Sequence, residues 1–232
     1  MKGIPLQNRP VVALALSIGY FATGMTLAAV IFYTNGAYTW KDAVISNFLS
    51  LSTNSHGYLF ACVGMIASGL MLVPLQVFLH RTIHSPHRMA RTAALIIFCI
   101  GTLGLAAMGA MAIVVDSFGD LHVRMTFATL AGLVAAIITY SGILLHATPR
   151  TRSPQRMLLK VLITLMLAVL AFLIYVYITP EYLSDKSIWT SIAVCEWIIC
   201  LVLGMCFYLL IRCVDSGLQT KSLSRRITSP TQ

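Results

Sequence analysis

The sequence predicts an all-α membrane protein, a single bundle of six transmembrane helices. Hydrophobic residues make up 58% of the 232 positions and charged residues only 10%, and the mean hydropathy is +0.86. Such a chain is too apolar for a soluble domain, whose surface must face water. Each of its apolar stretches reaches the roughly 20 residues that a helix needs to cross a hydrocarbon core about 30 Å thick. They lie near 11–33, 57–79, 92–115, 123–145, 158–178 and 188–211.

The first stretch is expected to be a retained helix rather than a cleaved signal peptide. Lys2 and Arg9 precede it, but its apolar run is longer than that of a signal peptide, and Phe32-Tyr33-Thr34-Asn35 offers no pattern of small residues for cleavage. The longest connection, about 34 to 56, is too short to form a second domain. We therefore expect residues 1–232 to form one membrane domain.

Small residues mark the faces on which the middle helices should pack. They recur every four positions in the third and fourth stretches, and a shorter pair lies in the second, so neighbouring helices can approach closely there. The fifth stretch ends before Pro180, which cannot continue a helix. The strips are Gly64 and Ser68; Thr102, Ala106 and Ala110; and Ala128, Gly132 and Ala136.

The net charge of +9 is explained by topology rather than by nucleic acid. Thirteen of the basic residues fall on one side of the predicted membrane, which by the positive-inside rule places both termini in the cytoplasm. These residues should anchor the topology and contact anionic lipid headgroups. They are Lys2, Arg9, Arg81, Arg88, Arg91, Arg150, Arg152, Arg156, Lys160, Arg212, Lys221, Arg225 and Arg226.

The histidines do not favour a haem. His56 and His80 bracket the second stretch, and His122 and His146 bracket the fourth. At about 1.5 Å per residue the members of each pair lie roughly 36 Å apart, which exceeds the hydrocarbon core and places all four in the headgroup zones. Axial ligands should instead project into a buried pocket. No cofactor is identified from the sequence.

Glu196 is the first candidate for a functional residue. It lies inside the last apolar stretch, with no Lys, Arg or His from Ile188 to Leu210 to neutralise it within its own helix. An ionised carboxylate at that depth costs a few kcal/mol, so it needs a partner on another helix or must give up its charge.

Other polar residues on the same predicted side could converge with Glu196. Asp116, Asp120 and His122 lie at the turn between the third and fourth stretches, and Ser46 and His56 lie in the first outer connection. If that connection folds over the mouth of the bundle, the groups could bind a divalent metal, hold a lipid headgroup or act as an acid and base. The alternative is that Asp116 and Asp120 are ordinary loop charges and helix caps.

The chain resembles the FRAG/DRAM/Sfk family of six-span membrane proteins. The resemblance rests on Ile45-Ser46-Asn47, on Phe60 entering the second stretch, on the histidine that opens the fourth and above all on Cys195-Glu196-Trp197. By position, Ser46, His122, Glu196 and Trp197 match recurrent polar and aromatic positions of the family. At Asn47 the chain departs from the acid that relatives commonly have.

The resemblance implies a role in membrane lipid processes. Members are associated with remodelling the lipid of glycosylphosphatidylinositol anchors, with control of phosphoinositides and lipid asymmetry, and with autophagy. The expected function is that of a membrane protein that modulates lipid organisation or recruits partners. Its expected location is the plasma membrane, an endomembrane or a bacterial inner membrane.

Two alternatives remain at this stage. The first is an intramembrane acyltransferase or hydrolase, with Glu196 and His122 as catalytic groups and with Asp116, Asp120, His56, Ser46 and Trp197 as lipid or metal ligands. The second is a proton-coupled transporter that uses Glu196 as its carrier. No internal repeat supports the transporter.

Overall fold

The computed structural model describes residues 9–35, 48–83, 88–114, 119–179 and 192–228, and every regular element in these ranges is a helix. Six helices are long and apolar enough to cross a membrane, which confirms the predicted all-α class. The helices are α1 (Arg9–Thr34), α3 (Tyr58–Thr82), α4 (Arg88–Val114), α5 (Gly119–Ala147), α6 (Ser153–Ile178) and α7 (Ile192–Thr228).

The helices extend beyond the predicted apolar stretches, most of all in α7. Its apolar part, Val194–Ser216, ends close to the predicted boundary at 211, but the helix continues to Thr228. The added residues include Gln, Lys and Arg, which are good helix formers without being apolar. Helix α6 likewise starts at Ser153, because Pro154 in its first turn needs no amide hydrogen-bond partner.

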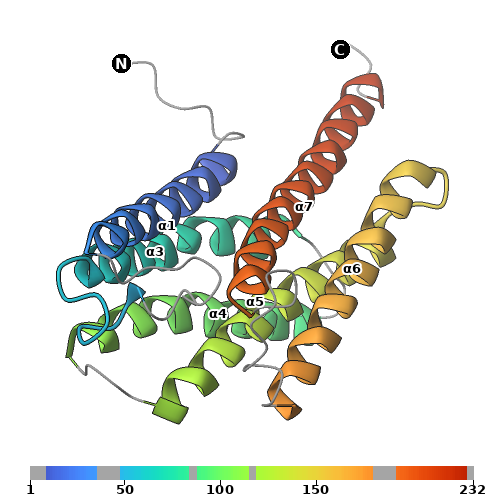
Figure 1. Cartoon of the computed structure of the whole chain (residues 1–232). Helices are drawn as coiled ribbons and strands as arrows, with labels where there is room; N and C mark the ends of the chain where they lie inside the picture. The colour runs from blue at the N-terminus through green and yellow to red at the C-terminus, as the bar shows by residue number, and fades with distance from the viewer. Residues whose placement is uncertain (1–8, 36–47, 84–87, 115–118, 180–191, 229–232) are drawn as a thin grey trace, which may run out of the picture.

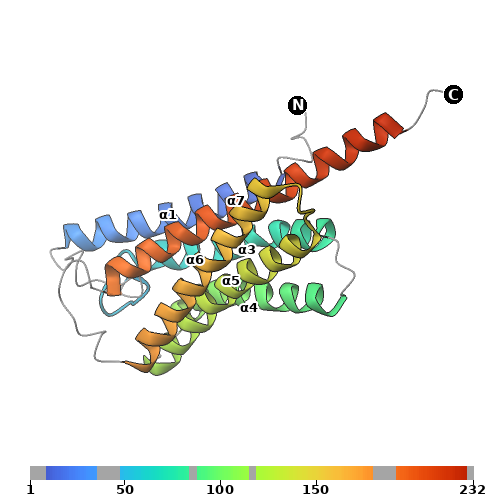
Figure 2. The same cartoon turned by 90° about the vertical axis from the view of Figure 1, so that its right-hand side faces the viewer.

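The first five helices pack in chain order, and the sixth returns to the start. Helix α1 lies along α3, α3 along α4, α4 along α5 and α5 along α6, whereas α7 contacts α1, α3, α5 and α6 more sparsely. Figures 1 and 2 show that α1 begins and α7 ends at the same end of the bundle, and Figure 2 shows α7 extending past the other helices there. Helix α7 therefore lies against several helices of the bundle without packing closely along any one of them.

Glycines set the closest helix crossings. A Cβ atom on Gly24 of α1 would lie 2.5 Å from the Phe60 carbonyl oxygen and 2.8 Å from the Gly64 Cα, so the two backbones touch. Gly132 of α5 meets the Gly101 backbone of α4 in the same way. These contacts use the close approach that small residues allow in membranes.

The predicted small-residue strips are correct in part. Gly64 and Gly132 lie in crossings, and a Cβ on Gly69 would meet Thr102 and Ala106. The outer members of two strips, Ala110 and Ala128, are instead exposed. A straight pair of helices diverges away from its crossing point, so a strip is used only over its central turns.

Hydrogen bonds between helices satisfy polar side chains inside the bundle. The Ser17 and Ser68 hydroxyl oxygens lie 2.8 Å apart, joining α1 to α3. The Gln76 side-chain amide donates to the Thr102 hydroxyl at 2.6 Å, joining α3 to α4. Because lipid tails offer no hydrogen-bond partners, such pairs remove a cost that buried polar groups would otherwise carry.

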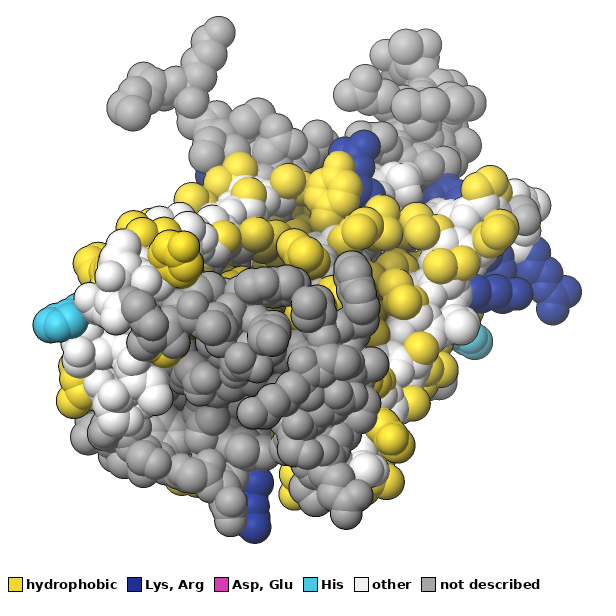
Figure 3. Space-filling view, in the orientation of Figure 1, with side chains coloured by type: hydrophobic (Ala, Val, Ile, Leu, Met, Phe, Trp, Pro, Cys, Tyr) yellow, Lys and Arg dark blue, Asp and Glu magenta, His cyan; other side chains and the backbone are white. Residues whose placement is uncertain are grey.

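Basic side chains gather at one end of the molecule, which we call the basic end; the opposite end is the far end. Figure 3 shows apolar side chains along the flanks, and most of the visible Lys and Arg lie where α7 leaves the bundle and where α5 turns into α6. The far end holds the end of α1 and the start of α7, hence Glu196. That the basic end faces the cytoplasm stays a prediction from the charge pattern.

Candidate functional site

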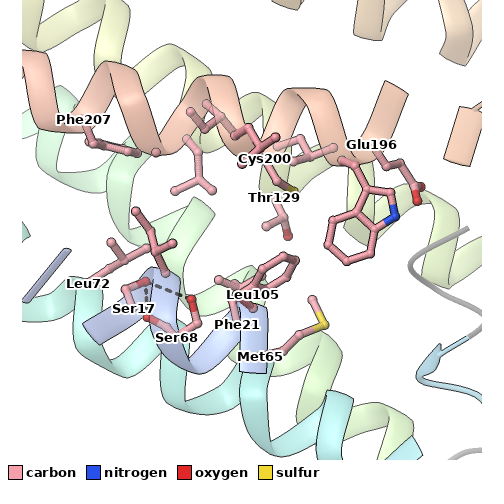
Figure 4. A pocket seen from close by; sticks show the side chains of 18 of the residues that line it. Ser17, Phe21, Met65, Ser68, Leu72, Leu105, Thr129, Glu196, Cys200 and Phe207 are labelled. Atoms are coloured by element: carbon pink, nitrogen blue, oxygen red, sulfur yellow. Dashed lines mark hydrogen bonds between the residues drawn. The ribbon is translucent and has the colours of Figure 1, made fainter. Parts of the chain in front are cut away.

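A cavity of about 200 Å³ lies between α7 and the bundle formed by α1, α3, α4 and α5. Its walls are mainly apolar. Figure 4 shows Cys200 and Phe207 of α7 on one side and Phe21, Leu72 and Leu105 on the other. All the lining residues except Leu49 belong to helices that are long and apolar enough to cross a membrane, so the cavity lies within the membrane-spanning part of the protein.

Two aromatic contacts fix α7 against the bundle, one to α1 and one to α4, on either side of this space. Trp197 packs edge-on against Phe21 of α1, with ring centroids 6.2 Å apart. Deeper in the bundle, Phe207 stacks on Phe98 of α4 at 5.0 Å. Between these contacts α7 presents the smaller residues Cys200 and Gly204 to the cavity. Helix α7 is thus held by bulky aromatic side chains on either side of the cavity, and its side chains are small between them.

The far end of the cavity is closed by aromatic residues. Phe48, which is fully buried, lies 6.3 Å from Trp197 and 6.2 Å from Phe32 between ring centroids. The Asn54 side-chain amide holds this segment in place by donating to the Ala28 carbonyl at 3.2 Å. The end of the connection before α3 therefore packs over the mouth of the bundle and brings the ring of Phe48 there, whereas residues 36–47 of this connection lie outside the described part of the structure.

The cavity opens sideways instead. Three of its lining residues are exposed on the flank of the molecule: Ile18 and Ala22 of α1, and Leu201 of α7. Ile18 is 45% and Leu201 is 71% exposed, so the gap between α1 and α7 faces the surrounding hydrocarbon. A hydrophobic chain could enter by this route without crossing water.

The polar groups of the cavity are unequally satisfied. Deeper in the wall, Ser17 bonds to both the hydroxyl and the carbonyl of Ser68. Nearer the far end, the Thr126 hydroxyl donates to the Met108 sulfur at 3.4 Å, a weak acceptor. The Thr129 hydroxyl is buried and has no hydrogen-bond partner within the described part of the structure. Glu196 completes this end of the lining.

Of the predicted site residues, Glu196 and Trp197 come together at this cavity. His56 lies exposed in the turn before α3, and its side chain is not among the lining residues. Asp120 and His122 belong to the first turn of α5, but their side chains lie outside the described part of the structure.

The remaining candidates are not placed. Asp116 and Ser46 fall outside the described residues, so the predicted convergence around Glu196 stays a prediction, and so do the enzyme and the transporter. Within the part of the chain that the structure describes, no three His, Cys, Asp or Glu side chains are grouped to hold a metal.

Sequence reasoning missed Gly204, Thr129 and Phe48. A signal for Gly204 was present, because Glu196, Cys200 and Gly204 follow one another at four-residue spacing and share a face of α7. Thr129 and Phe48 gave no such signal, since each matters through its contacts with distant segments.

The comparison with known families agrees with the fold. Residues 10–215 match the family model described as the Frag1/DRAM/Sfk1/Cwh43P N-terminal domain. No curated protein and no solved structure matches the chain. The matched region contains nearly all of the apolar helices and every lining residue of the cavity. The chain is a multi-pass membrane protein and belongs to the Frag1/DRAM/Sfk1 family.

Proposed function

We propose that this protein binds membrane lipid, taking one lipid chain into the cavity between α1 and α7, and through this binding modulates lipid organisation. The observation that carries the proposal is an apolar cavity that opens sideways between two membrane-spanning helices. Lipid-linked processes such as lipid homeostasis and autophagy-type membrane regulation are the setting in which we place this activity. Family membership supports that setting.

The cavity suits a chain from one leaflet. From Glu196 to Phe207 its wall runs roughly 16 Å along α7, at about 1.5 Å per residue. This is close to half of a hydrocarbon core about 30 Å thick. The wall begins at the far end, so the chain would come from the leaflet on that side.

The volume suits part of a lipid rather than a whole one. About 200 Å³ exceeds the cavity of roughly 150 Å³ that accepts benzene in an engineered protein core. It is smaller than the roughly 300–1,000 Å³ of pockets that enclose a whole drug-sized ligand. A single chain inside the cavity, with the rest of the lipid outside the lateral opening, fits both limits.

At the basic end we propose contacts with anionic headgroups. Exposed cations there include Arg81, Arg88, Arg150 and Lys160. Arg156 has a structural task instead, since its guanidinium donates to the Leu145 and Thr148 carbonyls at the end of α5. Cations near a membrane surface each contribute about 1 kcal/mol of attraction to anionic lipid.

Filling the opening should displace the chain. In Gly204→Leu the new Cβ lies 3.1 Å from the Ile18 Cδ1, and the rest of the side chain occupies the gap between α1 and α7. Overpacking costs about 1–3 kcal/mol, and about 1.4 kcal/mol, in the lower half of that range, corresponds to roughly tenfold weaker binding. We expect about tenfold less lipid to remain with the purified protein, measured by quantitative mass spectrometry after exchange into mild detergent.

Gly142→Leu is the matched control. Nothing lies within 4 Å of a Cβ at Gly142, which is not part of the cavity lining, so this variant should keep the wild-type lipid content. Equal lipid content in folded Gly204→Leu and Gly142→Leu would contradict the proposed function.

A further inference from the structure

The cavity lining contains a hydroxyl group, that of Thr129, for which the described residues provide no hydrogen-bond partner. Thr129 is 1% exposed and lines the cavity, yet its hydroxyl has no partner. A buried polar group without a partner costs about 1–3 kcal/mol. In the membrane the cost is not relieved by water, so a ligand that reaches this group would gain from pairing with it.

The local geometry explains why the Thr129 hydroxyl has no protein partner. The hydroxyl packs against Gly104 of α4, where a Cβ atom would collide with it. Because glycine has no side chain, Gly104 offers no side-chain group to which the hydroxyl could hydrogen-bond. Figure 4 shows Thr129 between Cys200 and Leu105, at the middle of the space between α7 and the bundle. A turn about its χ1 bond to another staggered position can direct the hydroxyl towards a ligand in the cavity.

The two serine hydroxyls at the cavity, unlike that of Thr129, already have hydrogen-bond partners. Ser17 and Ser68 are already paired with each other at 2.8 Å. Beyond them the lining is apolar, with Leu14, Leu72 and Phe207 at the deep end. The lining therefore carries the polar residues Thr126, Thr129 and Glu196 from its middle towards the far end, and it is mainly apolar at the deep end. This asymmetry fixes both the orientation and the chemistry of a ligand.

We propose that the cavity selects a neutral single-chain lipid with a hydroxyl group at its head, and that the hydroxyl pairs with Thr129 while the chain extends towards Phe207. A hydroxyl is a complementary group because its oxygen can accept the hydrogen bond that Thr129 has available to donate. A charged headgroup cannot reach Thr129, because it would have to leave water for an apolar site, so a lipid with such a headgroup can insert only its chain and gains no hydrogen bond there. This inference rests on the proposed function, since it names the class of lipid that the cavity takes.

The test compares an alcohol with its parent hydrocarbon. The purified protein in phosphatidylcholine nanodiscs is labelled with a hydrocarbon chain that carries a photoreactive diazirine. Oleyl alcohol and cis-9-octadecene then compete with this label. We expect the alcohol to compete at about fivefold lower concentration, the effect of one net hydrogen bond. Thr129→Val should bring the two competitors to nearly equal concentrations.

Thr139→Val is the control on the same helix. Its hydroxyl donates to the Ala135 carbonyl and is not part of the cavity lining, so the preference for the alcohol should persist. Thr129→Val should also keep or raise the melting temperature of the ligand-free protein, because it removes a buried hydroxyl that has no partner. This measurement separates lost recognition from lost folding.

The outcomes distinguish the two proposals. If both competitors displace the label equally in the wild type and in Thr129→Val, the cavity takes a chain without recognising a hydroxyl, and this inference alone is wrong. If neither competitor displaces the label from wild-type protein, the cavity takes no chain, and the proposed function fails with it.

Discussion

Gly24→Leu is expected to abolish the folded protein. The α1–α3 crossing has no room for any side chain at this position, because a Cβ would lie 2.5 Å from the Phe60 carbonyl oxygen and 2.8 Å from the Gly64 Cα. Both obstacles are backbone atoms, so no rotamer change can relieve the collision, and the two helices must separate. Overpacking in a well-packed core costs about 1–3 kcal/mol and more where the backbone must move.

The measurement is size-exclusion chromatography of detergent-solubilised protein, followed by a melting curve. Gly19→Leu is the matched control, because it lies on the same helix and nothing stands within 4 Å of its Cβ. We expect the control to elute as wild type and Gly24→Leu to aggregate or fail to accumulate. A monodisperse Gly24→Leu protein that melts at the wild-type temperature would contradict the α1–α3 crossing.

Trp197→Ala is expected to detach the far end of α7. Trp197 links three parts of the chain, since its ring contacts Phe21 of α1 and Phe48 of the first connection. In a soluble core the change from Trp to Ala costs about 3–5 kcal/mol. We expect a smaller loss here, about 2 kcal/mol, because lipid can replace part of the lost packing.

The expected results are a lower melting temperature and less co-purified lipid, because the cavity loses its closed end. Trp197→Phe is the control, since a second aromatic ring can still pack against Phe21 and Phe48. It should retain most of the stability and most of the lipid. If Trp197→Ala matched the wild type in both measurements, Trp197 would have no role in closing the cavity.

The fold could be predicted because its signals are local. Each apolar stretch is by itself long enough to predict one membrane-spanning helix. The basic residues cluster between alternate stretches, which predicts the topology. The end of α7 was missed because hydropathy marks where the membrane ends, not where the helix ends, and the residues up to Thr228 keep helical propensity in water.

The site could be predicted only in part. Glu196 and Trp197 stood out as a buried acid and as part of a family motif, and both line the cavity. The cavity itself depends on how α7 sits against the bundle, where Phe207 stacks on Phe98 of α4 and Trp197 packs on Phe21 of α1. Contacts between residues so distant in the chain leave no periodic pattern, so the role of Thr129 becomes visible only in three dimensions.

The central claim is that a lipid chain enters the cavity between α1 and α7. The most direct test irradiates the protein in nanodiscs that contain a phospholipid with a diazirine on one acyl chain, and maps the labelled residues by mass spectrometry. Met65, Leu72 and Leu133 are buried within the protein but line the cavity, so they are reached only by a chain inside it. If a lipid chain occupies the cavity, we expect labels on these residues and also on Ile18 and Leu201 beside the opening. Labels confined to the exposed flanks, such as Leu167 and Ile174 of α6, with none on Met65, Leu72 or Leu133, would contradict it.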